Sequence, residues 1–364
     1  MTMAAHTPTS FLRRFLHDEA AGGVALLVAT VVALAWANLD PGSYEEAWHG
    51  DLDLRHWVNE GLMALFFFVV GLEVRRELLH GELRGRRTAT LPVVAALGGM
   101  VVPALLYLAV AGGRGWGIPM ATDIAFAVGV LALLGRRVPA GLKLFLLALA
   151  VVDDIGAVLV IALAYSEGIE PVRVLAAVVL LGIAGATPRP VPSVLLAVGA
   201  WAALLDSGVH ATLAGVAAAF VVPAGQEVEE RIHPWTSFVV VPLFALANAG
   251  VELDVAAAFD SAVGWGVIVG LVVGKPVGIV LAAAVTVRLR LGQLPAEVRW
   301  PHVVGAGALA GIGFTVSLFV TGLAFADPEV VEAATVAVLA ASVVAALAGA
   351  AVLTFWGSKN YVRE

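Results

Sequence analysis

Long apolar stretches recur from the beginning of this sequence to its end. A helix needs roughly 17 to 25 apolar residues to cross about 30 Å of hydrocarbon, because each residue advances about 1.5 Å. Twelve stretches meet or approach this length, and the sixth to eighth are the shortest. They cover residues 20–38, 57–74, 91–113, 115–135, 142–165, 172–187, 191–206, 208–223, 235–251, 262–286, 303–325 and 332–356. Backbone groups in lipid must hydrogen-bond internally, and strict apolar/polar alternation is absent, so we expect an all-α integral membrane protein with 12 transmembrane helices.

The composition also favours lipid over water as the solvent. Hydrophobic residues make up 60% of the chain and charged residues 13%, and the mean hydropathy is +0.95. Soluble domains carry roughly 25% charged residues, so a water-soluble globule is excluded. The net charge of -7 argues against a nucleic-acid partner, which requires a concentrated basic face. The absence of cysteine excludes disulfides, thiolate metal sites and a cysteine nucleophile.

The basic residues give an independent test of the number of spans, because short cytoplasmic loops are rich in Lys and Arg. With twelve crossings, seventeen of the 21 basic residues fall on the side that holds both termini. The opposite side holds only Arg55, Arg114 and Arg173, and Lys275 lies within a span. Both termini are therefore expected in the cytoplasm. The first apolar run could instead be a cleaved signal peptide, but Asp18 and Glu19 interrupt its basic region and its removal would spoil the charge segregation.

No polar stretch is long enough to form a soluble domain, so we expect residues 1–364 to form a single membrane transporter domain. Within the spans, Asp123, Asp153, Asp154 and Lys275 lie far from any end. A charge at mid-bilayer costs about 2.5 to 3.5 kcal/mol or more, so each requires a reason. A structural alternative is that Lys275 pairs with one aspartate to hold helices together. One lysine cannot neutralise three carboxylates, however, so at least one must be protonated, bind a cation or face a wet cavity.

Asp153 and Asp154 are adjacent, and neighbours on a helix point about 100° apart. Both can therefore approach one ion only if the ion lies between their faces. Two carboxylates in a partly dehydrated site cannot both ionise cheaply, so we expect one to hold a proton until a cation arrives. Oxygen ligands suit Na⁺ or Li⁺, and no His or Cys cluster indicates a transition metal.

Two of the spans contain helix-breaking residues. Gly117 and Pro119 precede Asp123 in the fourth span, and Gly311 and Gly313 interrupt the eleventh. Such breaks often serve packing alone, but a pair of them is typical of transporter sites built from inverted repeats, here spans 3–5 and 10–12. If the discontinuous helices 4 and 11 cross, Asp123 could compensate the half-helix N-termini and Lys275 the C-termini.

Several motifs resemble those of the NhaA family of bacterial Na⁺/H⁺ antiporters, and they extend over nearly the whole chain. They are GLMA at 61–64, GLEV at 71–74, ATDIAF at 121–126, VDDIGA at 152–157, GVHATLAG at 208–215, HPW at 233–235, 244–250, GKP at 274–276 and 311–317. The resemblance implies that Asp153 and Asp154 bind the cation (Na⁺) and protons, and that Lys275 forms a salt bridge with Asp153. It also implies that Thr122 and Asp123 support the site at the helix break, and that the protein lies in the bacterial cytoplasmic membrane.

The sequence departs from the family pattern at two places. The first outer loop, 39–55, is too short for the β-hairpin through which some members dimerise, which leaves a homodimer open. Glu230 replaces a second histidine in the cluster at the start of the ninth helix. Candidate pH-sensing residues there and on the second helix are Glu229, Glu230, His233, Glu73, Arg76 and Glu77. A solvated, charged loop end is the alternative interpretation of this cluster.

These observations favour a secondary active antiporter over an enzyme. We expect it to export Na⁺ or Li⁺ in exchange for external protons by alternating access, with no cofactor, membrane lipid as its surroundings and a role in Na⁺ and pH homeostasis. If Lys275 loses its proton when Na⁺ arrives, two protons exchange for one Na⁺ and transport is electrogenic. If Lys275 stays charged, exchange is electroneutral. A cation channel would more naturally show a repeated filter segment, and an intramembrane aspartyl protease would place its acids on separate helices.

Overall fold

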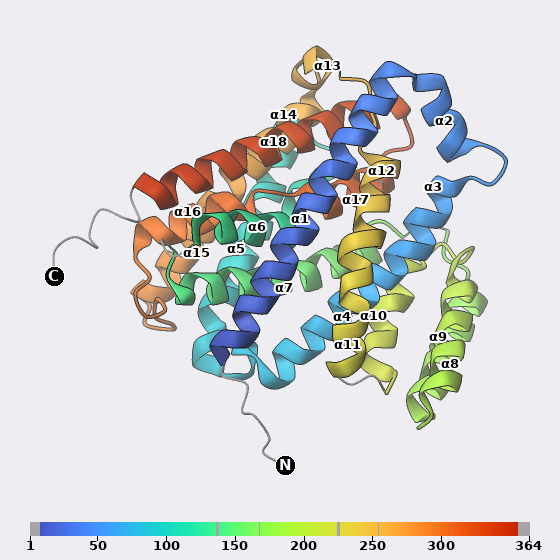
Figure 1. The fold of residues 1–364 in the computed structure, drawn as a ribbon, viewed down its shortest axis with the longest axis horizontal. Helices are drawn as coiled ribbons and strands as arrows, with labels where there is room; N and C mark the ends of the chain where they lie inside the picture. The colour runs from blue at the N-terminus through green and yellow to red at the C-terminus, as the bar shows by residue number, and fades with distance from the viewer. Residues whose placement is uncertain (1–7, 136–137, 167, 224–225, 254, 356–364) are drawn as a thin grey trace.

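The computed structural model describes residues 8–135, 138–166, 168–223, 226–253 and 255–355, and within these ranges every regular element is a helix (Figure 1). The first half contains α1 (Pro8–Leu39), α2 (Pro41–His49), α3 (Leu54–Trp57), η1 (Val58–Leu62), α4 (Met63–His80), η2 (Glu82–Arg84), α5 (Arg86–Val110), η3 (Arg114–Met120), α6 (Ile124–Leu134), α7 (Ala140–Ala164) and α8 (Pro171–Ala186). The second half contains α9 (Pro190–Leu204), α10 (Thr212–Val221), α11 (Gln226–Trp235), η5 (Thr236–Val240), α12 (Val241–Asn248), α13 (Val255–Asp260), α14 (Ala262–Val269), η6 (Gly270–Gly274), α15 (Lys275–Arg288), α16 (Trp300–Ala310), α17 (Phe314–Ala324) and α18 (Pro328–Phe355). The all-α prediction is confirmed for the described residues.

The expected spans coincide with helical segments, but not all of these are long enough to cross a membrane. Seven segments in the described ranges have the required length and apolar character, and the bent pair α16–α17 makes an eighth. The helices α8, α9 and α10 are apolar but shorter. Twelve crossings therefore stay a prediction. Four of the basic residues used in the charge segregation, Arg136, Arg137, Lys359 and Arg363, lie outside the described residues.

Both expected helix breaks are present. The tight turns of η3 end at Met120, residues 121–123 are extended, and α6 begins at Ile124. In the second, α16 ends at Ala310 and α17 begins at Phe314, with a bend of 44° between them. Each break leaves backbone N–H and C=O groups without helical partners, which must be satisfied by other residues.

Two further irregularities come from prolines. The π-helical turns η5 and η6 each end two residues before a proline, at Pro242 and Pro276. A helical proline has no N–H and its ring clashes with the carbonyl four residues earlier, which in both cases lies inside the π-helical turn. Widening the helix relieves that clash. The turn at η6 directly precedes Lys275, so Pro276 helps to set the direction in which this lysine leaves the helix.

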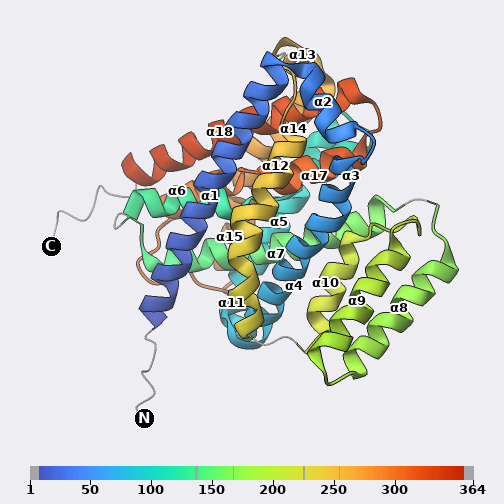
Figure 2. The same cartoon turned by 45° about the vertical axis from the view of Figure 1, so that its right-hand side comes forward.

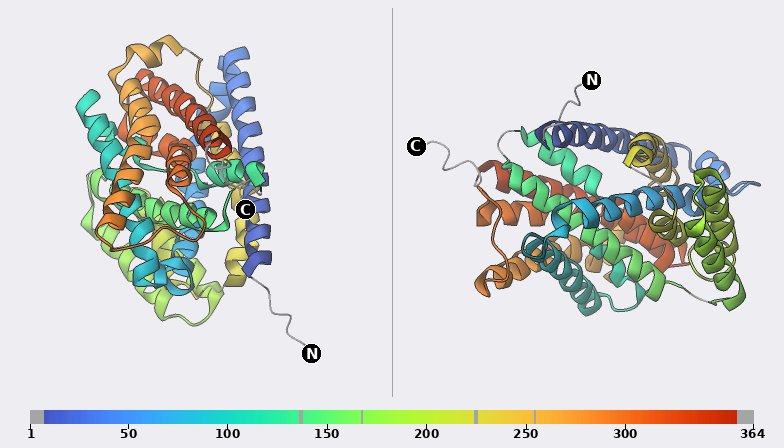
Figure 3. Two further views of the ribbon diagram at one scale, coloured as in Figure 1. Left: turned by 90° about the vertical axis from the view of Figure 1, so that its left-hand side faces the viewer. Right: turned by 90° about the horizontal axis from the view of Figure 1, so that it is seen from below.

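Close helix packing surrounds the breaks. Helices α5 and α15 approach so closely that a Cβ on Gly98 would meet the carbonyl of Gly278, and a Cβ on Gly278 that of Gly98. The main hydrophobic core joins α5, α7 and the segments from α14 to α18 with parts of α1, α4 and α12. Helices α8, α9 and α10 form a group at one side (Figure 2), and α1 lies at the edge of the bundle in both views of Figure 3.

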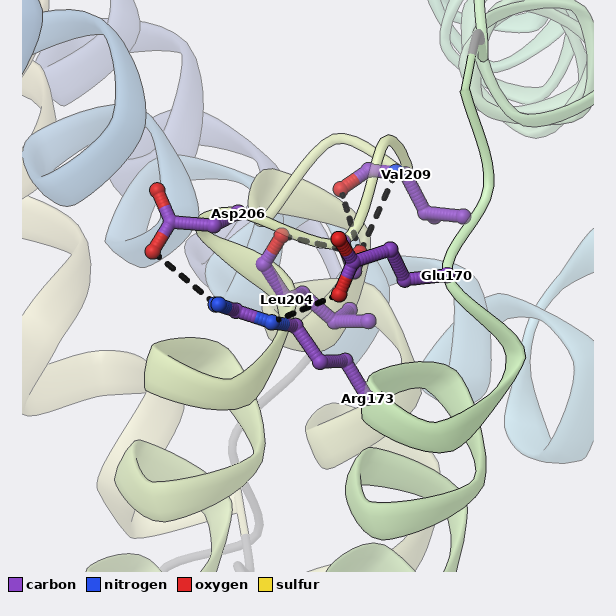
Figure 4. Close-up of polar contacts among 6 residues, drawn as sticks. Glu170, Arg173, Leu204, Asp206 and Val209 are labelled. Carbon is purple, nitrogen blue, oxygen red and sulfur yellow. Dashed lines mark hydrogen bonds and ion pairs between the residues drawn. The ribbon is translucent and has the colours of Figure 1, made fainter.

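The loops of this side group are tied at one end by exposed polar contacts (Figure 4). Arg173 lies 3.0 Å from Glu170 (Nε to Oε2) and 2.9 Å from Asp206 (Nη1 to Oδ2). Exposed pairs of this kind contribute about 0 to 1 kcal/mol, so they fix the loop more than they stabilise the fold. The short segment 39–55 contains α2 and no strand, in agreement with the expectation that it cannot form a β-hairpin.

Candidate functional site

A buried ion pair lies at the centre of the molecule. The Lys275 Nζ atom at the start of α15 is 2.7 Å from Asp153 Oδ2 on α7, and both side chains are fully buried. Lys275 also donates a hydrogen bond to the carbonyl of Met120, the last residue of η3. The other carboxylate oxygen of Asp153, Oδ1, is buried and has no hydrogen-bond partner among the described residues. Such an oxygen can accept a proton or coordinate a cation.

Thr122 connects this pair to the second helix break. Its hydroxyl lies 2.7 Å from Asp153 Oδ2 and 2.9 Å from the carbonyl of Ala310, the last residue of α16. A hydroxyl has a single proton, so it is shared between these two acceptors, and its own lone pairs are available to a cation. The two broken helices therefore meet at Asp153.

Asp123 serves both half-helix N-termini. One oxygen, Oδ1, accepts from the backbone N–H of Phe126 in the first turn of α6 at 3.0 Å. The other, Oδ2, accepts from the N–H of Thr315 at 3.1 Å and from its hydroxyl at 2.7 Å, in the first turn of α17. The Asp123 N–H in turn donates to the carbonyl of Ile312 at 2.6 Å. One carboxylate thus caps two helices whose N-termini carry partial positive charge.

Asp154 differs from its neighbour because it faces a cavity. A cavity of about 60 Å³ is bordered by Asp154, Thr122, Asp123, Thr315, Glu73 and His233, among others. Within the described part of the chain the carboxylate of Asp154 has no hydrogen-bond partner, whereas that of Asp153 is occupied by Lys275 and Thr122. The 100° between neighbouring side chains on α7 thus separates an acid held by Lys275 from an acid that borders a cavity large enough to hold water.

The residues considered for pH sensing gather where α4 meets α11. His233 Nε2 lies 3.5 Å from Glu73 Oε1, and Arg76 forms an ion pair with Glu229. Burial raises the pKa of Glu229, which precedes the predicted ninth span, and Arg76 opposes that rise. The remaining two residues of the cluster are Glu77, which is buried, and Glu230, which is exposed. Glu73 and His233 therefore lie at the cavity that contains Asp154, and Glu230 faces solvent.

Three hydroxyl residues near the two helix breaks were not predicted from the sequence as part of the site. Thr315 caps with Asp123 as described, and Ser317 donates to the carbonyl of Ile118 at 2.6 Å. Ser342 of α18 accepts from the N–H of Phe314 at 3.4 Å. Thr315 and Ser317 come shortly after Gly311 and Gly313 in the sequence, and this position next to a helix break could have identified them. Nothing near Ser342 in the sequence indicates its contact.

The ligand types present suit a hard cation as cargo. Among the described residues, no group of three or more His, Cys, Asp or Glu side chains could hold a metal ion. Carboxylate, hydroxyl and carbonyl oxygens instead converge around Asp153, and such oxygens favour Na⁺ or Li⁺ over transition metals. Crossed broken helices around buried charges, within a bundle of apolar helices, define the class of secondary transporters.

Comparison with known proteins gives the family. The family model described as Na⁺/H⁺ antiporter 1 matches residues 13–353, so the chain belongs to this family. The chain is 48% identical to a Na(+)/H(+) antiporter NhaA of Rhizorhabdus wittichii, over 95% of this chain and 98% of the relative. It is 46% identical to Na(+)/H(+) antiporter NhaA 2 of Pseudomonas syringae pv. syringae, over 94% of this chain and 95% of that relative. The resemblance inferred from the motifs is confirmed, and the chain is a multi-pass protein of the bacterial cytoplasmic membrane.

Proposed function

We propose that this protein is a Na⁺/H⁺ antiporter that exports Na⁺ or Li⁺ from the cytoplasm in exchange for external protons. The observation that carries the proposal is the different state of two adjacent acids. Asp153 is sealed by Lys275, whereas Asp154 borders a cavity that extends to Glu73 and His233. Family membership supports the exchanged ions, because the relatives bear the name Na(+)/H(+) antiporter.

In this proposal a cation enters along the cavity and binds between the two acids. Asp154 releases its proton to water in the cavity as the cation binds its carboxylate, and the ammonium of Lys275 is displaced from Asp153. The ligands are the carboxylates of Asp153 and Asp154 and the hydroxyl of Thr122. Alternating access follows when α6 and α17, whose N-termini share Asp123, move relative to α4 and α12 and expose the site to the other side.

The proposed exchange is electrogenic. An ammonium separated from its carboxylate partner, here Asp153, in a dry site tends to lose its proton, so Lys275 supplies one proton and Asp154 the other. Two protons for one Na⁺ move one net positive charge inward, which the membrane potential drives by about 2.3 kcal/mol per 100 mV. In the electroneutral alternative, Lys275 stays charged and one proton is exchanged.

The proposed topology has twelve spans, both termini in the cytoplasm and one membrane domain over residues 1–364. In this topology α8, α9 and α10 are short crossings, and spans 3–5 and 10–12 are inverted repeats. The crossing of the two breaks and the close approach of α5 to α15 support the repeat relation. We further propose that the protein works in lipid, with a homodimer as the assembly to test, and without a cofactor beyond Na⁺, Li⁺ and protons. The cluster of Glu73, Arg76 and His233 is the proposed pH-responsive region.

Everted vesicles with an acid interior test the exchange. Addition of Na⁺ or Li⁺ should dissipate the pH gradient, and the two cations added separately give the preference. No response to either cation from pH 6.5 to 9 would refute the proposal. In proteoliposomes clamped with K⁺ and valinomycin, an interior negative potential should accelerate Na⁺ efflux. Efflux that is indifferent to voltage would favour the one-proton scheme.

A further inference from the structure

A cluster of polar side chains joins α12 to the helix that contains α3, η1 and α4, at the end of these helices away from Glu73 and His233. Asn59 and Asn248 exchange two amide hydrogen bonds, of 3.1 Å from Asn59 Nδ2 to Asn248 Oδ1 and 2.8 Å in the reverse direction. Arg55 Nε donates to the same oxygen of Asn248 at 3.2 Å. The second Nδ2 proton of Asn248 goes to the carbonyl of Phe244 at 2.9 Å. Every donor and acceptor of the Asn248 amide is therefore used.

Three aromatic side chains lie between this cluster and the cavity. Phe319 of α17 lies 5.6 Å from Phe67 of α4 and 6.2 Å from Phe244 of α12, between ring centroids. All three are buried, with at most 3% of their surface exposed. Phe319 is one helical turn after Thr315, the residue that contacts Asp123. Each ring therefore lies about one helical turn from a residue that lines the cavity, namely Val70, Val241 and Thr315.

The two sets of contacts differ in kind. The link between α4 and α12 is made of directional, fully satisfied hydrogen bonds between buried or half-buried amides, which are costly to break because each partner would be left unpaired. The link from α17 to these helices is made of aromatic packing, which has no unpaired polar group to expose when it parts. A movement of α17 relative to α4 and α12 is thus less costly than a separation of α4 from α12.

We propose that Arg55, Asn59 and Asn248 form an amide clamp that keeps α4 and α12 together as one unit. During transport, Phe319 alternately packs between Phe67 and Phe244 and moves away from them, while these two rings stay in place. The clamp residues are positioning residues, because they act through the two phenylalanines and do not touch the ion site. The inference rests on the alternating access proposed above, and it adds which contacts part and which persist.

The absence of cysteine in the chain permits a direct test by reversible cross-linking. The variant Asn59→Cys/Asn248→Cys removes the amide pair and should exchange Na⁺ for protons about threefold more slowly or worse. A short, reducible bifunctional thiosulfonate across the two cysteines should restore the rate. The matched variant Phe67→Cys/Phe319→Cys, bridged in the same way, should lose exchange and recover it with reductant. If the bridge between positions 59 and 248 blocks exchange, or if the unbridged variant matches the parent chain, the clamp is refuted.

A distance measurement separates failure of the clamp from failure of the proposed transport. Leu54 lies in α3 at the start of the helix that continues into α4, Leu253 lies five residues after α12, and Ala326 lies two residues after α17; all three side chains are exposed. Spin labels on Leu54→Cys and Leu253→Cys therefore report this helix against the end of α12, and labels on Leu54→Cys and Ala326→Cys report it against the end of α17. Between pH 6 without Na⁺ and pH 8.5 with Na⁺, the first distance should stay within about 2 Å and the second should shift by more. Equal shifts in both would overturn the clamp. If the unsubstituted protein shows no exchange of Na⁺ for protons, the proposed function is overturned, but the distance measurements still test the clamp.

Discussion

Replacement of Asp123 tests whether one carboxylate supports two half-helices. Its two oxygens cap α6 and α17 through the N–H groups of Phe126 and Thr315, and Oδ2 also accepts from the Thr315 hydroxyl. Loss of an N-cap costs roughly 1 kcal/mol, and loss of a hydrogen bond to a charged acceptor costs about 1.5 kcal/mol or more. We therefore expect Asp123→Ala to lower the free energy of unfolding by about 3 kcal/mol. Asp123→Asn keeps one acceptor oxygen, so it should lose about half as much.

The assay is thermal unfolding in detergent, with Na⁺-dependent proton flux measured on the same preparations. The melting temperature should fall in the order parent, Asp123→Asn, Asp123→Ala, and flux should be impaired but not abolished. Asp206→Ala is a suitable control, because Asp206 is an exposed aspartate in an ion pair with Arg173 and should change little. If the Asp123→Ala variant melts within about 1 °C of the parent and transports normally, the double cap contributes nothing.

Four further substitutions test the site. Asp154→Asn should abolish Na⁺-dependent proton flux in vesicles, because an amide cannot exchange a proton for a cation; retained flux would remove Asp154 from the mechanism. Asp153→Asn should also be severe, and normal transport by it would contradict the two-acid site. Lys275→Gln should lower the free energy of unfolding by about 3 to 5 kcal/mol, because it leaves Asp153 buried without a counter-charge. The double variant Lys275→Gln/Asp153→Asn should recover most of that stability without restoring transport. If it recovers none, the stabilities of Lys275 and Asp153 are not coupled. Because the pKa of Glu229 is raised, this group stabilises the fold at pH values below its ordinary 4.5 and loses that contribution as pH rises through the raised value. The melting temperature should therefore decline over that pH range, and Glu229→Gln should flatten the decline. An unchanged pH profile in this variant would exclude Glu229 as the cause.

Much of the architecture could be predicted because lipid imposes simple requirements. Apolar length gave the helical segments, and Gly117, Pro119, Gly311 and Gly313 marked both breaks, since lipid leaves few positions where the backbone can leave a helix. The π-helical turns η5 and η6 were not predicted, although both precede a proline, because a proline can kink, widen or end a helix and the neighbouring helices decide which. Length alone likewise does not decide whether α8, α9 and α10 cross the membrane.

The contacts within the site were harder to predict because they join residues far apart in sequence. Helical periodicity places Asp153 and Asp154 about 100° apart, but it does not say which of them faces Lys275 and which faces the cavity. The contact of Ser342 with Phe314, and that of Asn59 with Asn248, depend on how separate helices pack. Neither leaves a pattern in the residues nearby.

The distribution of charge at the crossing indicates which acid carries the exchange. Lys275 balances Asp153 at 2.7 Å. Each helix N-terminus carries roughly half a positive charge, so the two that meet at Asp123 balance about one carboxylate. Asp154 has no comparable partner among the described residues and borders the cavity. A carboxylate in that position must hold a proton or a cation, because a lone negative charge in a poorly hydrated site is unstable. In the proposed mechanism, a proton and Na⁺ therefore compete first at Asp154, and Asp153 becomes available only when the cation displaces Lys275.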